Sequence, residues 1–276
     1  MRTDQKLLFT DIDGTLLKSD QTISHETAEL LSLLARDGHG LILSSGRPFG
    51  SILQVMEYLH TRISTPFSRE YIIANNGAQV YDCIAKETIL EKRLSYDLVD
   101  PLQALAEEYN VHIQTYTDTN IICTCDDAET RSYQKRIILP VLISPRLSDA
   151  LQGKAPYKML ALSLKGSDYL MPFKNRLLAQ YQNRLACIFS GNGYLEIIDK
   201  SADKGNALRF LTEHLQIPIQ YTYAAGDSEN DLGMIRAAGY GYAMANATDS
   251  VKSAAPFVTL STNEEGGVGE IIRAML

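Results

Sequence analysis

Two aspartates with one residue between them stand near the start of the chain, directly after an apolar run. Asp11 and Asp13 follow Leu-Leu-Phe-Thr, and residues 6–13 are predicted to form a buried strand. Side chains two positions apart on a strand lie on the same face, so both carboxylates should point at one spot beyond the strand. Two buried anions are costly unless a cation or a proton separates them. Mg²⁺, which prefers oxygen ligands, is the expected cation.

Three further segments place polar side chains where a predicted strand ends or a helix begins. They are Ser44-Ser45-Gly46-Arg47 at the end of a strand at 40–45, Lys204 before a helix at 206–215, and Asp227-Ser228-Glu229-Asn230-Asp231 after a strand at 221–225. In open α/β sheets, ligands bind outside the carboxyl ends of the strands. Each segment alone is an ordinary turn or helix cap. Four of them together predict a single site.

The first and last thirds of the sequence alternate between strand and helix patterns. The predicted order is a strand at 6–13, a helix from Ser24 to about Gly38, a strand at 40–45, a helix at 49–59 and a strand at 71–74, resuming after Lys204 with a helix at 206–215, a strand at 221–225, a helix at 230–238, a strand at 240–245, a short helix, a strand at 257–260 and a helix at 268–276. Such alternation predicts an α/β fold built on a doubly wound parallel sheet.

The middle of the chain has a different pattern. It predicts helices at 96–109, at 127–139 and up to about Tyr181, strands at 158–164, 184–190 and 194–198, and a hairpin at 113–125 around a turn at 117–120. This is an α+β unit, not a continuation of the strand–helix alternation. We therefore expect a core at 1–82 and 191–276, split by an inserted α+β cap domain at 83–190.

Together, these motifs resemble the haloacid dehalogenase (HAD) superfamily of phosphohydrolases. The four motifs occur in the order typical of that superfamily, and Gly46-Arg47-Pro48, Asn76-Gly77-Ala78 and residues 226–231 are similar to its Cof-type branch. The resemblance covers the core and both flanks of the insert. The insert itself is similar to the C2-type cap of that branch in size, position and α/β character. The resemblance implies a Rossmann-like core with a cap and a Mg²⁺-dependent phosphatase activity.

The resemblance also implies roles for the residues of the first three motifs. Asp11 would be the nucleophile that forms an aspartyl-phosphate, and Asp13 would act as general acid and then as general base. Ser45 would bind the transferring phosphoryl group, with Ser44 as the alternative. Lys204 would neutralise charge between Asp11 and the phosphate.

A second set of implied roles concerns the metal and the substrate phosphate. Mg²⁺ would be held by Asp11, the backbone carbonyl of Asp13 and Asp227, with Asp231 as a direct or water-mediated partner. Gly46, Arg47 and Asn230 would lie around the substrate phosphate, where free N–H groups at a helix start favour anions. A surface salt bridge is an equally good reading of Arg47.

Composition restricts the partners. The formal net charge of −7 over 276 residues argues against binding to nucleic acid or to an anionic membrane, since such proteins normally carry a basic stripe. No apolar stretch is long enough to span a bilayer, and the first residues do not form an apolar leader. The four cysteines lack paired zinc-ligand spacing and are expected to be reduced thiols. We expect a cytoplasmic protein.

The resulting hypothesis is a phosphatase that hydrolyses a small phosphorylated metabolite. Family resemblance favours sugar phosphates, with pyridoxal phosphate and flavin mononucleotide as further candidates.

A phosphomutase of the same fold would use Asp11 and return phosphate to the sugar. A receiver-type signalling domain needs no second carboxylate two residues on. A non-catalytic phosphometabolite sensor would gain nothing from Asp13 as an acid. The sequence carries no signal for an oligomeric state.

Overall fold

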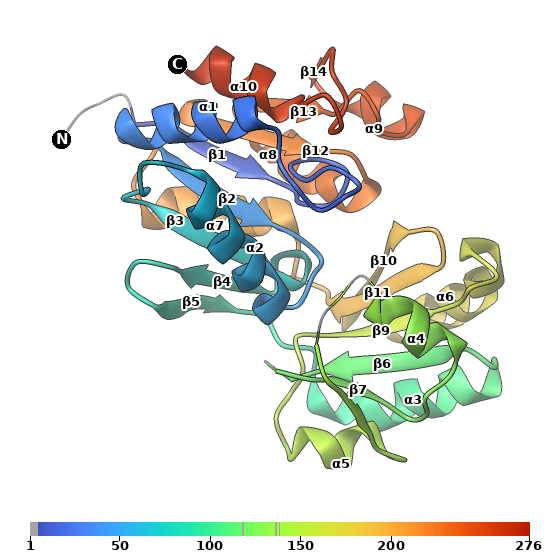
Figure 1. Ribbon diagram of the computed structural model, residues 1–276. Coiled ribbons are helices and arrows are strands. Elements are labelled where there is room, and N and C mark those ends of the chain that lie inside the picture. The colour runs from blue at the N-terminus through green and yellow to red at the C-terminus, as the bar shows by residue number, and fades with distance from the viewer. Residues whose placement is uncertain (1–4, 118, 136, 138) are drawn as a thin grey trace.

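The computed structural model describes residues 5–117, 119–135, 137 and 139–276, which fold around two β-sheets. Figure 1 shows the larger sheet with helices on both faces. The smaller sheet has its own helices and lies at the lower right of this view, beside the larger sheet. The first sheet is formed by the two ends of the chain and the second by its middle. The predicted α/β core with an inserted α+β cap is confirmed.

The core sheet contains eight strands in the order β14-β13-β12-β1-β2-β3-β4-β5. Its parallel strands are β1 (Leu7–Thr10), β2 (Gly40–Ser44), β3 (Glu70–Ala74), β12 (Thr222–Gly226), β13 (Tyr240–Ala243) and β14 (Phe257–Val258). The antiparallel hairpin β4 (Gln79–Asp82) and β5 (Glu87–Glu91) extends one edge. Because β1 lies between β12 and β2, the ends of these three strands meet in the middle of the sheet.

Helices cover both faces of the core sheet, as the strand–helix alternation predicts. One face packs against α1 (His25–Arg36), α2 (Phe49–Arg62) and α10 (Val268–Met275). The other face packs against α7 (Lys204–His214) and α8 (Leu232–Ala237). Short elements complete the core: η1 (Asn75–Gly77), η3 (Ile219–Tyr221), η4 (Glu229–Asp231) and α9 (Asp249–Ala254). Residues of β1 alternate between the two faces, so Leu8 joins one hydrophobic cluster and Leu7 and Phe9 join the other.

The cap sheet contains six strands in the order β10-β11-β9-β6-β7-β8. They are β6 (His112–Tyr116), β7 (Ile121–Cys123), β8 (Val141–Ile143), β9 (Lys158–Leu162), β10 (Leu185–Gly191) and β11 (Tyr194–Asp199). The helical elements of the cap are η2 (Tyr96–Leu98), α3 (Val99–Glu108), α4 (Ala128–Gln134), α5 (Leu147–Leu151) and α6 (Ser167–Tyr181). Met159, Ala161, Leu195 and Ile197 share a hydrophobic cluster with α3, α5 and α6. On the opposite face of the sheet, Leu160 and Leu162 pack with Tyr133 of α4 in a smaller cluster.

The membership of strands in the two sheets places both boundaries between core and cap later in the sequence than the expected limits at 82/83 and 190/191. Strand β5 continues the core sheet, and β11 lies between β10 and β9 in the cap sheet. Alternating hydrophobicity marks a strand but does not say which sheet it joins. We therefore propose that the cap begins after Glu91 and ends at Asp199.

Most predicted elements are present, with differences at their ends. The strand predicted at 6–13 ends at Thr10, so Asp11 and Asp13 lie in the turn that follows it. The helix predicted at 127–139 ends at Gln134. Residues 118, 136 and 138 of the predicted hairpin and helix lie outside the described residues. The four cysteines are free, and no helix of the described chain is long and apolar enough to cross a membrane.

Candidate active site

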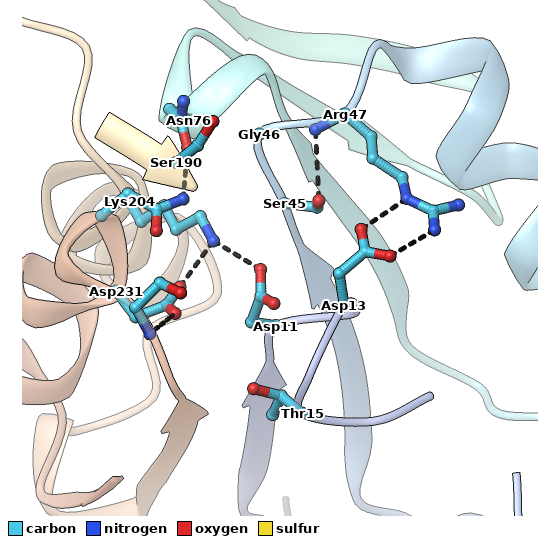
Figure 2. Close-up of polar contacts among 12 residues, drawn as sticks. Asp11, Asp13, Thr15, Ser45, Gly46, Arg47, Asn76, Ser190, Lys204 and Asp231 are labelled. Atoms are coloured by element: carbon cyan, nitrogen blue, oxygen red, sulfur yellow. Dashed lines mark hydrogen bonds and ion pairs between the residues drawn. The ribbon is translucent and has the colours of Figure 1, made fainter. Parts of the chain in front are cut away.

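The carboxyl ends of β1, β2 and β12 and the first residue of α7 bring the predicted side chains together. Asp11 follows β1, Ser45 follows β2, Asp227 follows β12, and Lys204 opens α7. Figure 2 shows Asp11 between Lys204 on one side and Asp13 with Arg47 on the other. Side chains as far apart in the sequence as Asp11 and Asp227 thus meet at one edge of the sheet, as the topology predicts.

Lys204 stands at the centre of this arrangement. Its Nζ donates to Oδ1 of Asp11 at 2.6 Å and to Oδ1 of Asp231 at 2.6 Å. The lysine is 1% exposed. Burial by itself would lower the pKa of this ammonium, but the two carboxylates outweigh burial and raise it. Lys204 is therefore a permanent buried cation that bridges the ends of β1 and β12.

The start of α7 packs directly against a glycine, Gly77, which has no side chain to displace it. Gly77 has φ of +92°, and a Cβ there would lie 2.3 Å from the carbonyl oxygen of Asp203. Asp203 caps α7, because its side chain accepts hydrogen bonds from the backbone N–H groups of Gly205 and Asn206. A side chain at position 77 would push this cap, and Lys204 with it, away from Asp11.

Three carboxylates surround a single point of the site. Oxygen atoms of Asp11, Asp227 and Asp231 lie within 4.8 Å of one another. Burial, followed by the charge of Asp231, raises the pKa of Asp11 well above its ordinary value. Burial and Asp231 likewise raise the pKa of Asp227 to about 6. One lysine does not balance three carboxylates, so this cluster fits a divalent cation.

The turn after β12 fixes the two carboxylates that it carries. Oδ2 of Asp231 accepts the backbone N–H groups of Asp227 and Ser228 at 3.0 Å each. Asp227 accepts the hydroxyl of Thr15 at 2.9 Å and that of Ser228 at 3.0 Å. Thr15 belongs to the turn after β1, so this hydrogen bond joins the turns that carry Asp11 and Asp227. The sequence motifs had not assigned Thr15 a role.

Asp13 forms a bidentate ion pair with Arg47. Nε and Nη2 of the guanidinium donate to its two oxygens at 2.7 Å and 2.6 Å, and Nη2 also donates to Oε1 of Gln21 at 2.6 Å. The salt bridge expected as one reading of Arg47 is therefore present, but the arginine is only 9% exposed and does not lie on the open surface. Asp13 and Arg47 both line the cavity beside Asp11.

The tandem serines occupy different environments. Ser45 lines the cavity, and its Oγ accepts the backbone N–H of Arg47 at 3.1 Å. Ser44 is the last residue of β2, and its fully buried Oγ has no hydrogen-bond partner in the described chain. The geometry favours Ser45 as the hydroxyl that faces a substrate.

Core and cap together enclose a cavity of about 60 Å³. Its core lining consists of Asp11, Asp13, Ser45, Gly46, Arg47, Ser228 and Asn230. Its cap lining consists of Tyr133, Ile137, Ser190, Tyr194 and Glu196. Such a small cavity suits a compact substrate group such as phosphate.

Several residues of the site carried no assigned role in the sequence motifs. Asn76, whose Oδ1 accepts from Nδ2 of Asn230 at 2.9 Å, connects η1 to the turn after β12. The cap residues were missed because patterns of helix and strand do not show which side chains line a cavity. Glu196 carries one signal, a charge within the apolar run Tyr-Leu-Glu-Ile-Ile. Lys158, before Met-Leu-Ala-Leu, carries the same signal but does not line this cavity.

Comparison with known proteins agrees with this architecture. The family model for haloacid dehalogenase-like hydrolases matches residues 8–272. The chain is 31% identical to Phosphatase YwpJ of Bacillus subtilis, over 98% of this chain and 100% of that one. It is 28% identical to the 5-amino-6-(5-phospho-D-ribitylamino)uracil phosphatase YwtE of Bacillus subtilis, over 98% of each chain. A haloacid dehalogenase-like hydrolase from Bacteroides thetaiotaomicron superimposes with a TM-score of 0.85 at 28% identity, over 99% of this chain and 100% of that one.

The chain therefore belongs to the haloacid dehalogenase-like hydrolases. The resemblance predicted from the four motifs is confirmed, and so is the Cof-like character of the core. Relatives that are named phosphatases match this chain over nearly its full length. The chain is therefore an enzyme, a phosphatase of this family.

Proposed function

We propose that the enzyme is a Mg²⁺-dependent phosphatase of small phosphorylated metabolites that works through an aspartyl-phosphate on Asp11. The observation that carries this proposal is the position of the Asp11 carboxylate on the cavity wall. Lys204 binds its Oδ1, and no hydrogen bond within the described chain occupies Oδ2. A carboxylate held at one oxygen presents the other for in-line attack on phosphorus.

Mg²⁺ fits the carboxylate cluster described above. Asp11, the backbone carbonyl of Asp13 and Asp227 would hold the ion, while Asp231, already bound to Lys204 and to two backbone N–H groups, would act through a metal-bound water. When bound, Mg²⁺ supplies positive charge to the phosphoryl oxygens. Ser45, Lys204 and Asn230 would supply the remaining charge stabilisation.

Asp13 would protonate the leaving group and then activate water. A carboxylate bound at both oxygens by a guanidinium has no proton to donate, and the pairing opposes its protonation. We therefore infer that the substrate phosphate draws Arg47 away from Asp13, which assigns Arg47 to the phosphate and frees Asp13 for the acid step. Gly46, whose backbone lies beside Ser45 on the cavity wall, would approach the same phosphate.

Asp13→Asn should slow hydrolysis of alkyl phosphates by about 10²–10⁴-fold, because an alkoxide leaves slowly without a proton. With p-nitrophenyl phosphate the first turnover should survive, since nitrophenolate needs no acid. Rapid-mixing kinetics should then show a burst of one nitrophenolate per site, followed by slow steady-state release. Unchanged alkyl phosphate kinetics would contradict the acid role.

The substrate class follows from the relatives and from the size of the cavity. YwtE is named for a phosphorylated ribityl compound, and the enclosed space suits a small leaving group. We propose sugar and sugar-alcohol phosphates first, then pyridoxal phosphate and flavin mononucleotide.

Purified protein with Mg²⁺ should release inorganic phosphate from at least one member of a panel of these compounds. An isomerised sugar phosphate in place of free phosphate would indicate a mutase. Binding without either product would indicate a sensor.

A further inference from the structure

Lys158 is a buried cation of the cap that reaches the core. It opens strand β9 and is 1% exposed. Its Nζ forms an ion pair with Oε2 of Glu196 at 2.8 Å and donates to the backbone carbonyl of Gly46 at 2.6 Å. The third side of the ammonium faces the ring of Tyr116, 4.9 Å from its centroid. One of these three partners belongs to the other domain, so Lys158 is fully satisfied only with the cap docked on the core.

Sheet geometry explains why Lys158 and Glu196 meet. In the antiparallel pair β9–β11, Lys158 lies opposite Ile198 and Glu196 lies opposite Leu160. The two charged residues are therefore diagonal neighbours on one face of the cap sheet. Met159 and Ile197 point to the other face, into the hydrophobic cluster under the cap helices. Alternation along the strands thus directs the ion pair toward the core domain.

The contact with Gly46 fixes one peptide unit of the phosphate-binding loop. The carbonyl of Ser45 accepts the N–H of Asn76 and that of Arg47 accepts the N–H of Asn75, at 3.1 Å each. The carbonyl between them, that of Gly46, is held by the cap lysine. In a planar trans peptide the C=O and the following N–H point in opposite directions. Holding the Gly46 carbonyl therefore also aims the N–H of Arg47, which donates to Oγ of Ser45.

We propose that Lys158 is a positioning residue that orients the Ser45 hydroxyl through the Gly46–Arg47 peptide when the cap closes. Because Ser45 Oγ accepts the backbone N–H, its own proton is directed to another acceptor, and a phosphoryl oxygen in the cavity is the acceptor that the proposed function supplies. Cap closure would then complete the phosphate site instead of only excluding water. This inference deepens the proposed function and depends on it.

A double-mutant cycle between Lys158 and Ser45 tests the proposal. Lys158→Met should lower kcat on an alkyl phosphate by about 10–100-fold, less than the 10²–10³-fold typical of removing a stabilising donor itself. In a Ser45→Ala background, Lys158→Met should lower kcat by no more than about twofold, because the hydroxyl through which Lys158 acts is already absent. Lys154→Met, at an exposed cap position, is the matched control and should behave like wild type.

Removing Lys158 alone leaves Glu196 as an unpaired buried charge, so the cycle is repeated with Lys158→Met/Glu196→Leu, which removes both charges. Thermal melts establish which of the two variants folds like wild type. The proposal would be overturned if removing Lys158 lowered kcat equally with and without the Ser45 hydroxyl. Wild-type kinetics in a folded variant that lacks Lys158 would overturn it as well.

The cycle also separates this proposal from the proposed function. If the wild-type enzyme releases phosphate from no substrate, the proposed function fails. The coupling is then measured on the affinity for inorganic phosphate, by calorimetry with Mg²⁺ present. Coupling in that assay supports the contact between Lys158 and the Ser45 loop, and independent effects overturn it.

Discussion

Asp11→Asn is expected to lower phosphate release by about 10⁴-fold or more, the order of loss seen when a nucleophile is removed. The same change should raise the melting temperature of the metal-free protein. Burial and the charge of Asp231 raise the pKa of Asp11, which means that the ionised carboxylate destabilises the metal-free fold near neutral pH. An amide has no such charge, and Lys204 keeps its partner Asp231.

This pairing of lost activity with gained stability makes the test specific. A variant that lost activity through misfolding would melt at a lower temperature. Kinetics and thermal melts in chelator are therefore measured on the same preparations, with Asp249→Asn, at an exposed position of the core, as the matched control. Residual activity near the wild-type level would refute the nucleophile assignment. A lower melting temperature would refute the electrostatic account of the site.

The core could be predicted because local signals and topology agree there. Alternating strand and helix patterns allow few arrangements other than a doubly wound sheet, and such a sheet gathers the ends of its strands at one edge. Asp11, Ser45 and Asp227 each follow a buried strand, so their meeting required no knowledge of the tertiary contacts. Lys204 opens a helix and not a strand, and it was found through the motif.

The cap contribution could not be predicted, for physical reasons. Lys158 and Glu196 come together through the register of β9 and β11, which depends on pairing across 38 positions of sequence. Whether their face of the sheet meets solvent or the core depends on how the cap docks. The Arg47–Asp13 pair is a similar case, because a solvated arginine and a buried one look alike in sequence. Local sequence patterns thus identify the strands, but side-chain partners in the other domain can be identified only from the three-dimensional structure.

Removal of Mg²⁺ should abolish turnover, and the stability that the metal adds should depend on pH. The ordinary pKa of an aspartate is 3.8, whereas that of folded, metal-free Asp227 is about 6 and that of Asp11 is also raised. A carboxyl with a raised pKa in the folded chain stabilises the fold below its unfolded pKa, and this stability is lost as the pH rises through the folded value. The metal-free enzyme should therefore lose stability from about pH 4 upward through pH 6.

Mg²⁺ binds the ionised carboxylates, so it competes with protons for the same oxygens. At a hundredfold excess over its Kd, a ligand stabilises the folded state by about 2.7 kcal/mol. We expect a rise in melting temperature of roughly 5 °C or more at pH 8 and a much smaller rise at pH 5. Asp227→Asn, which removes a proposed ligand, should lose most of this rise. Equal stabilisation at both pH values, or full activity in chelator, would show that the carboxylates of Asp11 and Asp227 do not hold the metal.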